Sequence, residues 1–170
     1  SDIIAPSDMM DGRVLEIRQA LEKNKFYNTK ILSYAAKYAS NFYGPFRDAI
    51  DSRKNLSESS KETYQMDFAN ITEASLEIKL DINEGADILM VKPAMPNSDI
   101  IHSLSENYSI PIFAYQVSGE YSMIQLGIDK KIFDNNVIDE SLITLFRAGA
   151  KSVLTLSLIH ISEPTRRHLI

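Results

Sequence analysis

Residues 85–94 read GADILMVKPA, and this stretch decides the fold. Its centre, residues 88–91, is a short continuous apolar run, which is typical of a strand buried on both faces. Lys92 follows directly, and Lys37 likewise follows the apolar run at residues 31–34. A lysine at the end of a buried strand is held partly out of water, which lowers its pKa and leaves a neutral amine able to attack a carbonyl carbon. The alternative is that both are ordinary solvated lysines, since lysine side chains are mostly exposed.

Strand-like and helix-like patterns alternate along the whole chain. Strands are predicted at residues 3–5, 31–34, 88–91, 110–115 and 152–154. Helices are predicted from apolar positions three or four apart at residues 14–21, 71–82, 100–104, 121–126 and 137–146. This alternation indicates βα units and a parallel sheet. We expect Asp11 to cap the first helix, and the polar residues 51–62 to form a long loop that either closes over a site or is an inert insertion.

The composition excludes several classes of partner. The chain has 170 residues, 44% of them hydrophobic and 24% charged, with a net charge of −5. The acidic balance argues against nucleic acid or an anionic membrane as the main partner, and no apolar run is long enough to span a membrane. Cysteine is absent, so disulfides and cysteine metal sites are excluded within this stretch. These features favour the cytoplasm.

Five longer sequence motifs occur in order and at coherent spacing. They read SDMMDGRV at residues 7–14, SYAAKYASNFYGPFRDA at 33–49, TYQMDFAN at 63–70, EGADILMVKPA at 84–94 and AYQVSGEYSMI at 114–124. Together they resemble the porphobilinogen synthase family, also called 5-aminolevulinate dehydratase, from about Ile3 to about Thr155. The resemblance implies an α/β fold, the (β/α)₈ TIM barrel. Five strands are too few to close such a barrel, which typically needs about 250 residues.

We therefore expect residues 1–155 to be the C-terminal half of a barrel, a partial catalytic domain. Residues 156–170 read LSLIHISEPTRRHLI, with no amphipathic period and with a proline that breaks a helix. This run resembles the translation of an adapter used in sequencing libraries, and we expect it to be a non-native tail. A divergent natural C-terminus is the alternative. His160 and His168 fall in this tail, so we assign them no role.

The resemblance implies a reaction and two catalytic lysines. The family condenses two molecules of 5-aminolevulinate to porphobilinogen with loss of two waters, in porphyrin and heme biosynthesis. Lys92 is expected to form a Schiff base with the first, propionate-side substrate, and Lys37 with the second, acetate-side substrate. Two other functions stay open: a different class I, aldolase-like barrel lyase with one Schiff-base lysine, and a catalytically silent barrel fragment.

The resemblance also implies the residues that bind substrate. Arg47 matches a family arginine that reads the acetate-side carboxylate. Lys61 stands where the family has a second arginine, which keeps the charge but not the bidentate geometry. Gln65 matches a glutamine that contacts substrate. Ser118 matches a serine that binds the propionate-side carboxylate, whereas Leu156 occupies the place of its partner tyrosine.

Metal binding and assembly are implied in the same way. Glu77 aligns with a glutamate near a magnesium site remote from the catalytic centre, and its alternative is a solvated helix face. A carboxylate with several waters suits this hard cation. An active-site zinc is possible in the N-terminal half that this stretch lacks. A homo-oligomer, an octamer by resemblance, is expected.

Overall fold

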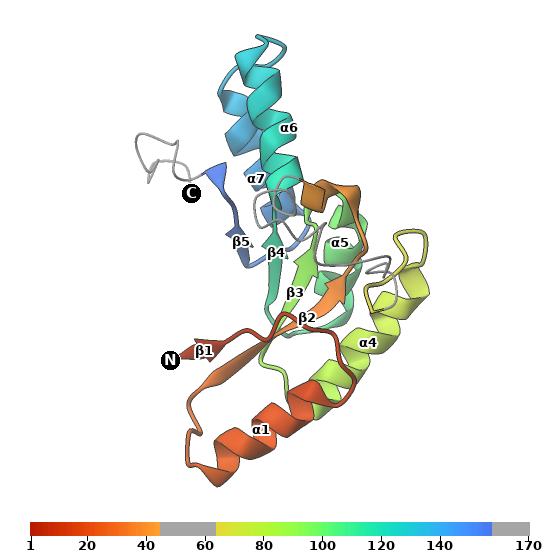
Figure 1. Cartoon of the computed structure of the whole chain (residues 1–170), viewed down its shortest axis with the longest axis vertical. Coiled ribbons are helices and arrows are strands. Elements are labelled where there is room, and N and C mark those ends of the chain that lie inside the picture. Colours follow the sequence, from red (N-terminus) through yellow and green to blue (C-terminus); the bar gives the residue numbers. More distant parts are fainter. Residues whose placement is uncertain (45–63, 158–170) are drawn as a thin grey trace.

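A computed structural model describes residues 1–44 and 64–157 of the chain (Figure 1). Its strands are β1 (Ile3–Ile4), β2 (Lys30–Lys37), β3 (Ile88–Lys92), β4 (Ile112–Tyr115) and β5 (Ser152–Leu154). Its α-helices are α1 (Arg13–Lys23), α4 (Ile71–Glu84), α5 (Ser98–Asn107), α6 (Ser118–Asp129) and α7 (Asn136–Arg147), with short 3₁₀ turns η1 (Asn41–Tyr43) and η3 (Met95–Asn97). The five predicted strands and five predicted helices are thus all present.

The strands form one parallel sheet in the order β1-β2-β3-β4-β5. Each strand lies beside the next one in the sequence, with a helix in each connection, so the chain is a series of βα units that moves in one direction. The sheet curls like part of a barrel wall, and β1 and β5 form its two edges (Figure 1). This arrangement confirms the predicted α/β class and the parallel sheet.

The two faces of the sheet are both apolar but are covered differently. The outer face packs against the helices in a large core that includes Leu89 and Val91 of β3 with Ile78 of α4, all fully buried. The inner face carries a smaller cluster of Leu32, Ile88 and Met90, against which lie the half-buried Tyr34, Phe113, Tyr115 and Leu154. Because side chains alternate along a strand, Lys92 belongs to the inner face with Met90.

The helix ends show which local predictions hold. Asn70 caps α4, because its side chain accepts hydrogen bonds from Thr72 N at 3.0 Å and Glu73 N at 3.4 Å. That helix ends at Gly85, as predicted, with φ of 101°. The prediction that Asp11 caps α1 is wrong. Gly12 occupies the N-cap with φ of 76°, and the carboxylate of Glu84 in α4 instead accepts a hydrogen bond from Leu15 N in the first turn of α1 at 3.2 Å.

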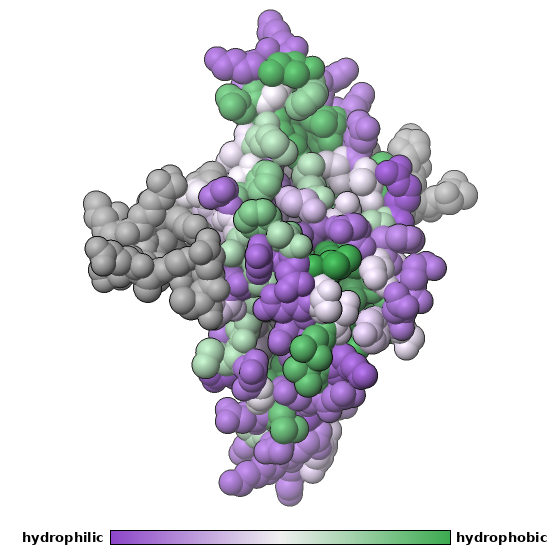
Figure 2. Space-filling view, turned by 90° about the vertical axis from the view of Figure 1, so that its right-hand side faces the viewer, coloured by the Kyte–Doolittle hydropathy of each residue, from purple (hydrophilic) through white to green (hydrophobic). Residues whose placement is uncertain are grey.

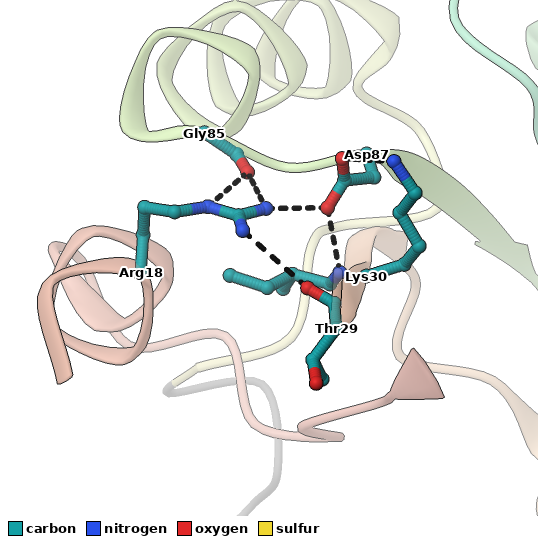
Figure 3. A network of polar contacts seen from close by, with 6 residues as sticks. Arg18, Thr29, Lys30, Gly85 and Asp87 are labelled. Carbon is teal, nitrogen blue, oxygen red and sulfur yellow. Dashed lines mark hydrogen bonds and ion pairs between the residues drawn. The ribbon is translucent and has the colours of Figure 1, made fainter. Parts of the chain in front are cut away.

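A polar network joins α1 to the amino ends of β2 and β3 (Figure 3). Arg18 donates to Gly85 O at 2.8 Å and forms an ion pair with Asp87. Asp87 also accepts from Ile31 N at 2.8 Å and lies 3.4 Å from Lys30 Nζ. Burial alone raises the pKa of Asp87, but these hydrogen bonds and the two cations outweigh it and lower that pKa.

Exposed apolar side chains gather at the end of the molecule formed by α6 and α7 (Figure 2). They include Leu126, Ile132 and Phe133, which are 57%, 70% and 47% exposed. Among the described helices, none is both long and apolar enough to cross a membrane.

Candidate active site

The two predicted lysines are paired at the carboxyl ends of neighbouring strands. Lys37 and Lys92 are register partners in the pairing of β2 with β3, and both are half-buried. Lys37 Nζ donates a hydrogen bond to the carbonyl oxygen of Ser7. The carboxyl ends of parallel strands are where barrel enzymes hold their chemistry. The structure therefore brings the two amines together at the carboxyl end of one sheet.

Aromatic rings surround these amines. Lys92 Nζ lies 4.2 Å from the ring centroid of Tyr115, 5.3 Å from that of Tyr43 and 5.6 Å from that of Tyr34. Lys37 Nζ lies 5.8 Å from the ring of Tyr34, so this ring is shared by both lysines. Such distances allow cation–π attraction when an amine is charged. Burial, and then the neighbouring Tyr115, raise the pKa of Tyr34, so its hydroxyl stays protonated at neutral pH.

Ser118 lies at the same end of the sheet, as the first residue of α6, three positions after the end of β4. The beginning of α6 packs closely against η1. A Cβ atom at Gly119 would lie 2.7 Å from Phe42 Cα and closer still to the Phe42 carbonyl oxygen. The hydroxyl of Tyr43, next in η1, donates to Lys92 O at 3.3 Å. Gly119 thus allows the contact that brings η1 against β3 and α6.

Two fully buried polar side chains, Glu120 and Gln116, lie near this carboxyl end of the sheet. Glu120 is fully buried, and its carboxylate accepts hydrogen bonds from Val117 N at 2.6 Å, Met95 N at 2.6 Å and Ala94 N at 3.3 Å. Burial raises the pKa of Glu120, although the three N–H donors act in the opposite direction. Gln116, also fully buried, donates to Ser141 Oγ at 3.1 Å. Glu120 thus binds the turns after β3 and β4, whereas Gln116 connects the end of β4 to α7.

The backbone beside Gln65 is hydrogen-bonded to Lys37, but the Gln65 side chain lines a separate pocket. Met66 N donates to Lys37 O at 3.1 Å, which holds this segment beside β2. The Gln65 side chain is buried, and its Oε1 atom has no hydrogen-bond partner within the described part of the chain. It lines a pocket of about 370 Å³ together with Asp11 and Glu77.

Glu77 lies on α4, half-buried among other acids. Burial raises its pKa, and the neighbouring carboxylates of Asp11, Asp81, Glu73 and Glu84 raise it further. Across residues 1–44 and 64–157, no three His, Cys, Asp or Glu side chains are grouped so as to hold a metal ion. Within that part of the chain, side chains alone thus do not form a chelating set around Glu77. The prediction that Glu77 binds magnesium then requires water as the other ligands.

Arg47 and Lys61 lie outside the described residues, as do the whole of the predicted loop at residues 51–62 and most of the predicted tail. Their roles stay predictions.

Sequence reasoning missed the three tyrosines and Glu120. Tyr115 had a usable signal, because it ends an apolar strand just as Lys92 does. Glu120 comes three residues after Val117, where a glutamate reaches back to the N-cap of a helix. No local pattern predicts that Glu120 also binds Ala94 and Met95, because those residues come from a different βα connection.

Comparisons with known proteins decide the family. A family model described as delta-aminolevulinic acid dehydratase matches residues 1–163. The chain belongs to this family. It is 54% identical over 155 residues to the delta-aminolevulinic acid dehydratase of Methanothermus sociabilis, which covers 91% of the chain and 48% of that relative. It is 50% identical over 163 residues to that of Archaeoglobus fulgidus, covering 96% of the chain and 50% of the relative.

A solved structure extends the likeness to the fold. The delta-aminolevulinic acid dehydratase (porphobilinogen synthase) of Toxoplasma gondii ME49, solved in complex with the reaction product porphobilinogen, matches with a TM-score of 0.88 and 46% identity. The match covers 92% of this chain and 45% of that one. The chain spans about half the length, or less, of the relatives that it matches.

Proposed function

We propose that this chain is the C-terminal catalytic half of a porphobilinogen synthase, which condenses two molecules of 5-aminolevulinate with loss of two waters. The observation that carries the proposal is the pairing of Lys37 with Lys92 on adjacent strands of the inner face. The product named for the Toxoplasma relative supports the same reaction class.

The two lysines have separate roles in this proposal. The neutral Nζ of Lys92 attacks the ketone carbon of the first, propionate-side substrate, and loss of water leaves an imine. Lys37 forms the corresponding imine with the second, acetate-side substrate. An imine makes the ketone carbon more electrophilic and its neighbouring C–H more acidic, so one substrate can attack the other. The rings of Tyr34, Tyr43 and Tyr115 restrict the position of the Lys92 amine.

Other side chains bind the substrate carboxylates. The Ser118 hydroxyl donates to the propionate-side carboxylate, near Lys92. Arg47 binds the acetate-side carboxylate through its two-pronged guanidinium, with Lys61 and Gln65 as further contacts from the loop. Gln65 fits this role less directly, since its side chain lines a pocket with Asp11 and Glu77.

The barrel is part of the proposal. The inner face of the sheet is apolar yet only half-buried at Tyr34, Phe113 and Leu154. β1 and β5 are parallel edge strands, and such strands pair readily with further strands. Additional βα units on these edges would close a (β/α)₈ barrel and cover that face. Residues 156–170 remain proposed as a tail foreign to the fold.

Metal, assembly and location are the less direct parts of the proposal. Glu77 would hold magnesium through one carboxylate oxygen and water, which supplies neutralising charge beside α4 rather than chemistry at the lysines. A zinc site would belong to residues outside this stretch. A homo-octamer is proposed from the family resemblance, and the cytoplasm from the composition of the chain, although plant relatives are named chloroplastic.

Borohydride reduction of the complete gene product with 5-aminolevulinate tests the function. An imine is reduced to a stable secondary amine, so mass spectrometry identifies the lysine that carries it. We expect labelling at Lys92 and, when the concentration of 5-aminolevulinate is varied, also at Lys37. A single-lysine, aldolase-like enzyme would label one of these positions only. Labelling at neither, with no porphobilinogen formed, would favour a catalytically silent fragment.

A further inference from the structure

Glu120 is a buried carboxylate that has no part in the proposed chemistry. Its side chain is fully inaccessible to solvent, although carboxylates are almost never fully buried unless paired. Among the residues that the structure describes, its hydrogen-bond donors are backbone N–H groups rather than cations. Oε1 accepts from Met95 N at 2.6 Å, and Oε2 accepts from Val117 N at 2.6 Å and from Ala94 N at 3.3 Å.

The three donors belong to two different turns. Ala94 and Met95 come directly after the Lys92–Pro93 peptide, at the carboxyl end of β3. Val117 comes directly before Ser118, at the carboxyl end of β4. One side chain therefore connects the segment that carries the Lys92 amine to the segment that carries the Ser118 hydroxyl.

We propose that Glu120 is a positioning residue of the site: its carboxylate fixes the distance between the turn after Lys92 and the turn before Ser118. The inference rests on the proposed function, because those two side chains are expected to hold one substrate at its ketone and at its carboxylate. A substrate gripped at two points reacts only when the two points keep their spacing.

The chemistry of the contacts requires a carboxylate of this length. Glutamine has one acceptor oxygen and one NH₂ donor, so in Glu120→Gln an N–H group of one turn faces another donor. Aspartate keeps both acceptor oxygens but is one methylene shorter, so in Glu120→Asp the carboxylate spans the two turns less well. Both variants release one turn while leaving the neighbouring core residues in place.

NMR of the complete gene product with ¹³C-methylated lysines tests the position of Lys92 without substrate. The Tyr115 ring, 4.2 Å from Nζ, shifts the Lys92 signal, and Lys92→Arg assigns that signal by removing it. We expect the signal to move most of the way to that of an exposed lysine in Glu120→Gln, and part of the way in Glu120→Asp. Asp87→Asn, at the opposite end of β3, is the matched control and should leave the signal in place.

Borohydride trapping of the same variants tests the consequence. Loss of one charge-assisted hydrogen bond should lower labelling at Lys92 roughly tenfold relative to labelling at Lys37 in Glu120→Gln. An unmoved Lys92 signal in Glu120→Gln, or an equal movement in Asp87→Asn, would overturn the positioning role, as would a parallel loss of label at both lysines. Failure of the wild type to label with 5-aminolevulinate would instead count against the proposed function, while the NMR comparison still decides the role of Glu120.

Discussion

The two ends of the strands are built on different principles. At the amino ends, Arg18, Lys30 and Asp87 pair charge with charge across α1, β2 and β3 (Figure 3). At the carboxyl ends, the amines of Lys37 and Lys92 lie over tyrosine rings. Charge pairs at the amino ends favour stability, whereas the carboxyl ends carry the two amines that the proposed chemistry requires. The same division holds in barrel enzymes in general.

The comparison teaches that burial of charge serves two purposes in this chain. Asp87 is held ionised by the hydrogen bond from Ile31 N and by the two cations Arg18 and Lys30, so it contributes to the free energy of unfolding. Glu120 is held by backbone N–H groups of two turns, and burial raises its pKa, so the proposed role of its carboxylate is to position these turns. Substitutions at the two ends should therefore separate activity from stability.

Lys92→Arg should have the largest effect. Arginine keeps the positive charge and can lie over the Tyr115 ring, but it cannot form the imine, so porphobilinogen formation should fall to the background rate. Product assay and thermal unfolding check this. Lys30→Arg at the amino end is the control, with turnover near that of the wild type, since arginine can still pair with Asp87. Appreciable turnover in Lys92→Arg would refute Schiff-base catalysis at this position.

Gly119→Ala should have the next largest effect. The added Cβ meets the backbone of Phe42, so η1 must move, and with it the Tyr43 hydroxyl that binds Lys92 O. Overpacking of this kind costs about 1–3 kcal/mol, and we expect turnover to fall roughly tenfold.

Gly127→Ala in the same helix is the matched control for that change. Its Cβ would lie 2.6 Å from Cε2 of Phe133, a partly exposed ring that can rotate away. Stability should fall slightly and turnover should not. Equal loss of turnover in the two variants would mean that α6 as a whole, rather than its contact with η1, matters.

The sequence predicted the elements well because short apolar strands and amphipathic helices are local patterns. Its largest error in a strand is at β2, predicted to end at residue 34 but extending to Lys37. Ala35 and Ala36 have low strand propensity, and pairing with β3 across a register irregularity overrides it. Lys37 could be predicted as a site residue. The grouping of Tyr34, Tyr43 and Tyr115 around Lys92 depends on contacts between separate βα units, as do the hydrogen bonds from Ala94 and Met95 to Glu120. No local sequence pattern encodes such contacts.

Asp87→Asn should alter stability without altering turnover. The substitution removes the ion pairs with Arg18 and Lys30 but leaves an oxygen that can accept from Ile31 N. Arg18 keeps its bonds to Gly85 O and Thr29 O, so no buried cation is left unpaired. Because Asp87 is partly exposed, we expect a loss of about 1–2 kcal/mol, checked by the urea midpoint. Asp8→Asn removes the exposed pair with Arg13 and should change the midpoint little.

The smallest expected effect is the pH dependence of the difference in stability between the wild type and Asp87→Asn. The pKa of Asp87 is lowered from its ordinary 3.8, so the stability it contributes is fully present above that value and is lost as the pH falls through the folded-state pKa. The gap in urea midpoint between wild type and Asp87→Asn should therefore be constant from neutral pH to about pH 5 and shrink below about pH 4.

Glu77→Gln is the control of opposite sign. Because burial and neighbouring acids raise the pKa of Glu77, its cost to stability is present at neutral pH and declines as the pH falls toward 4.5. In metal-free buffer, Glu77→Gln should thus be the more stable protein at neutral pH, and its advantage should shrink on acidification. A gap for Asp87→Asn that grows with acid would mean that Arg18 and Lys30 do not hold this carboxylate ionised.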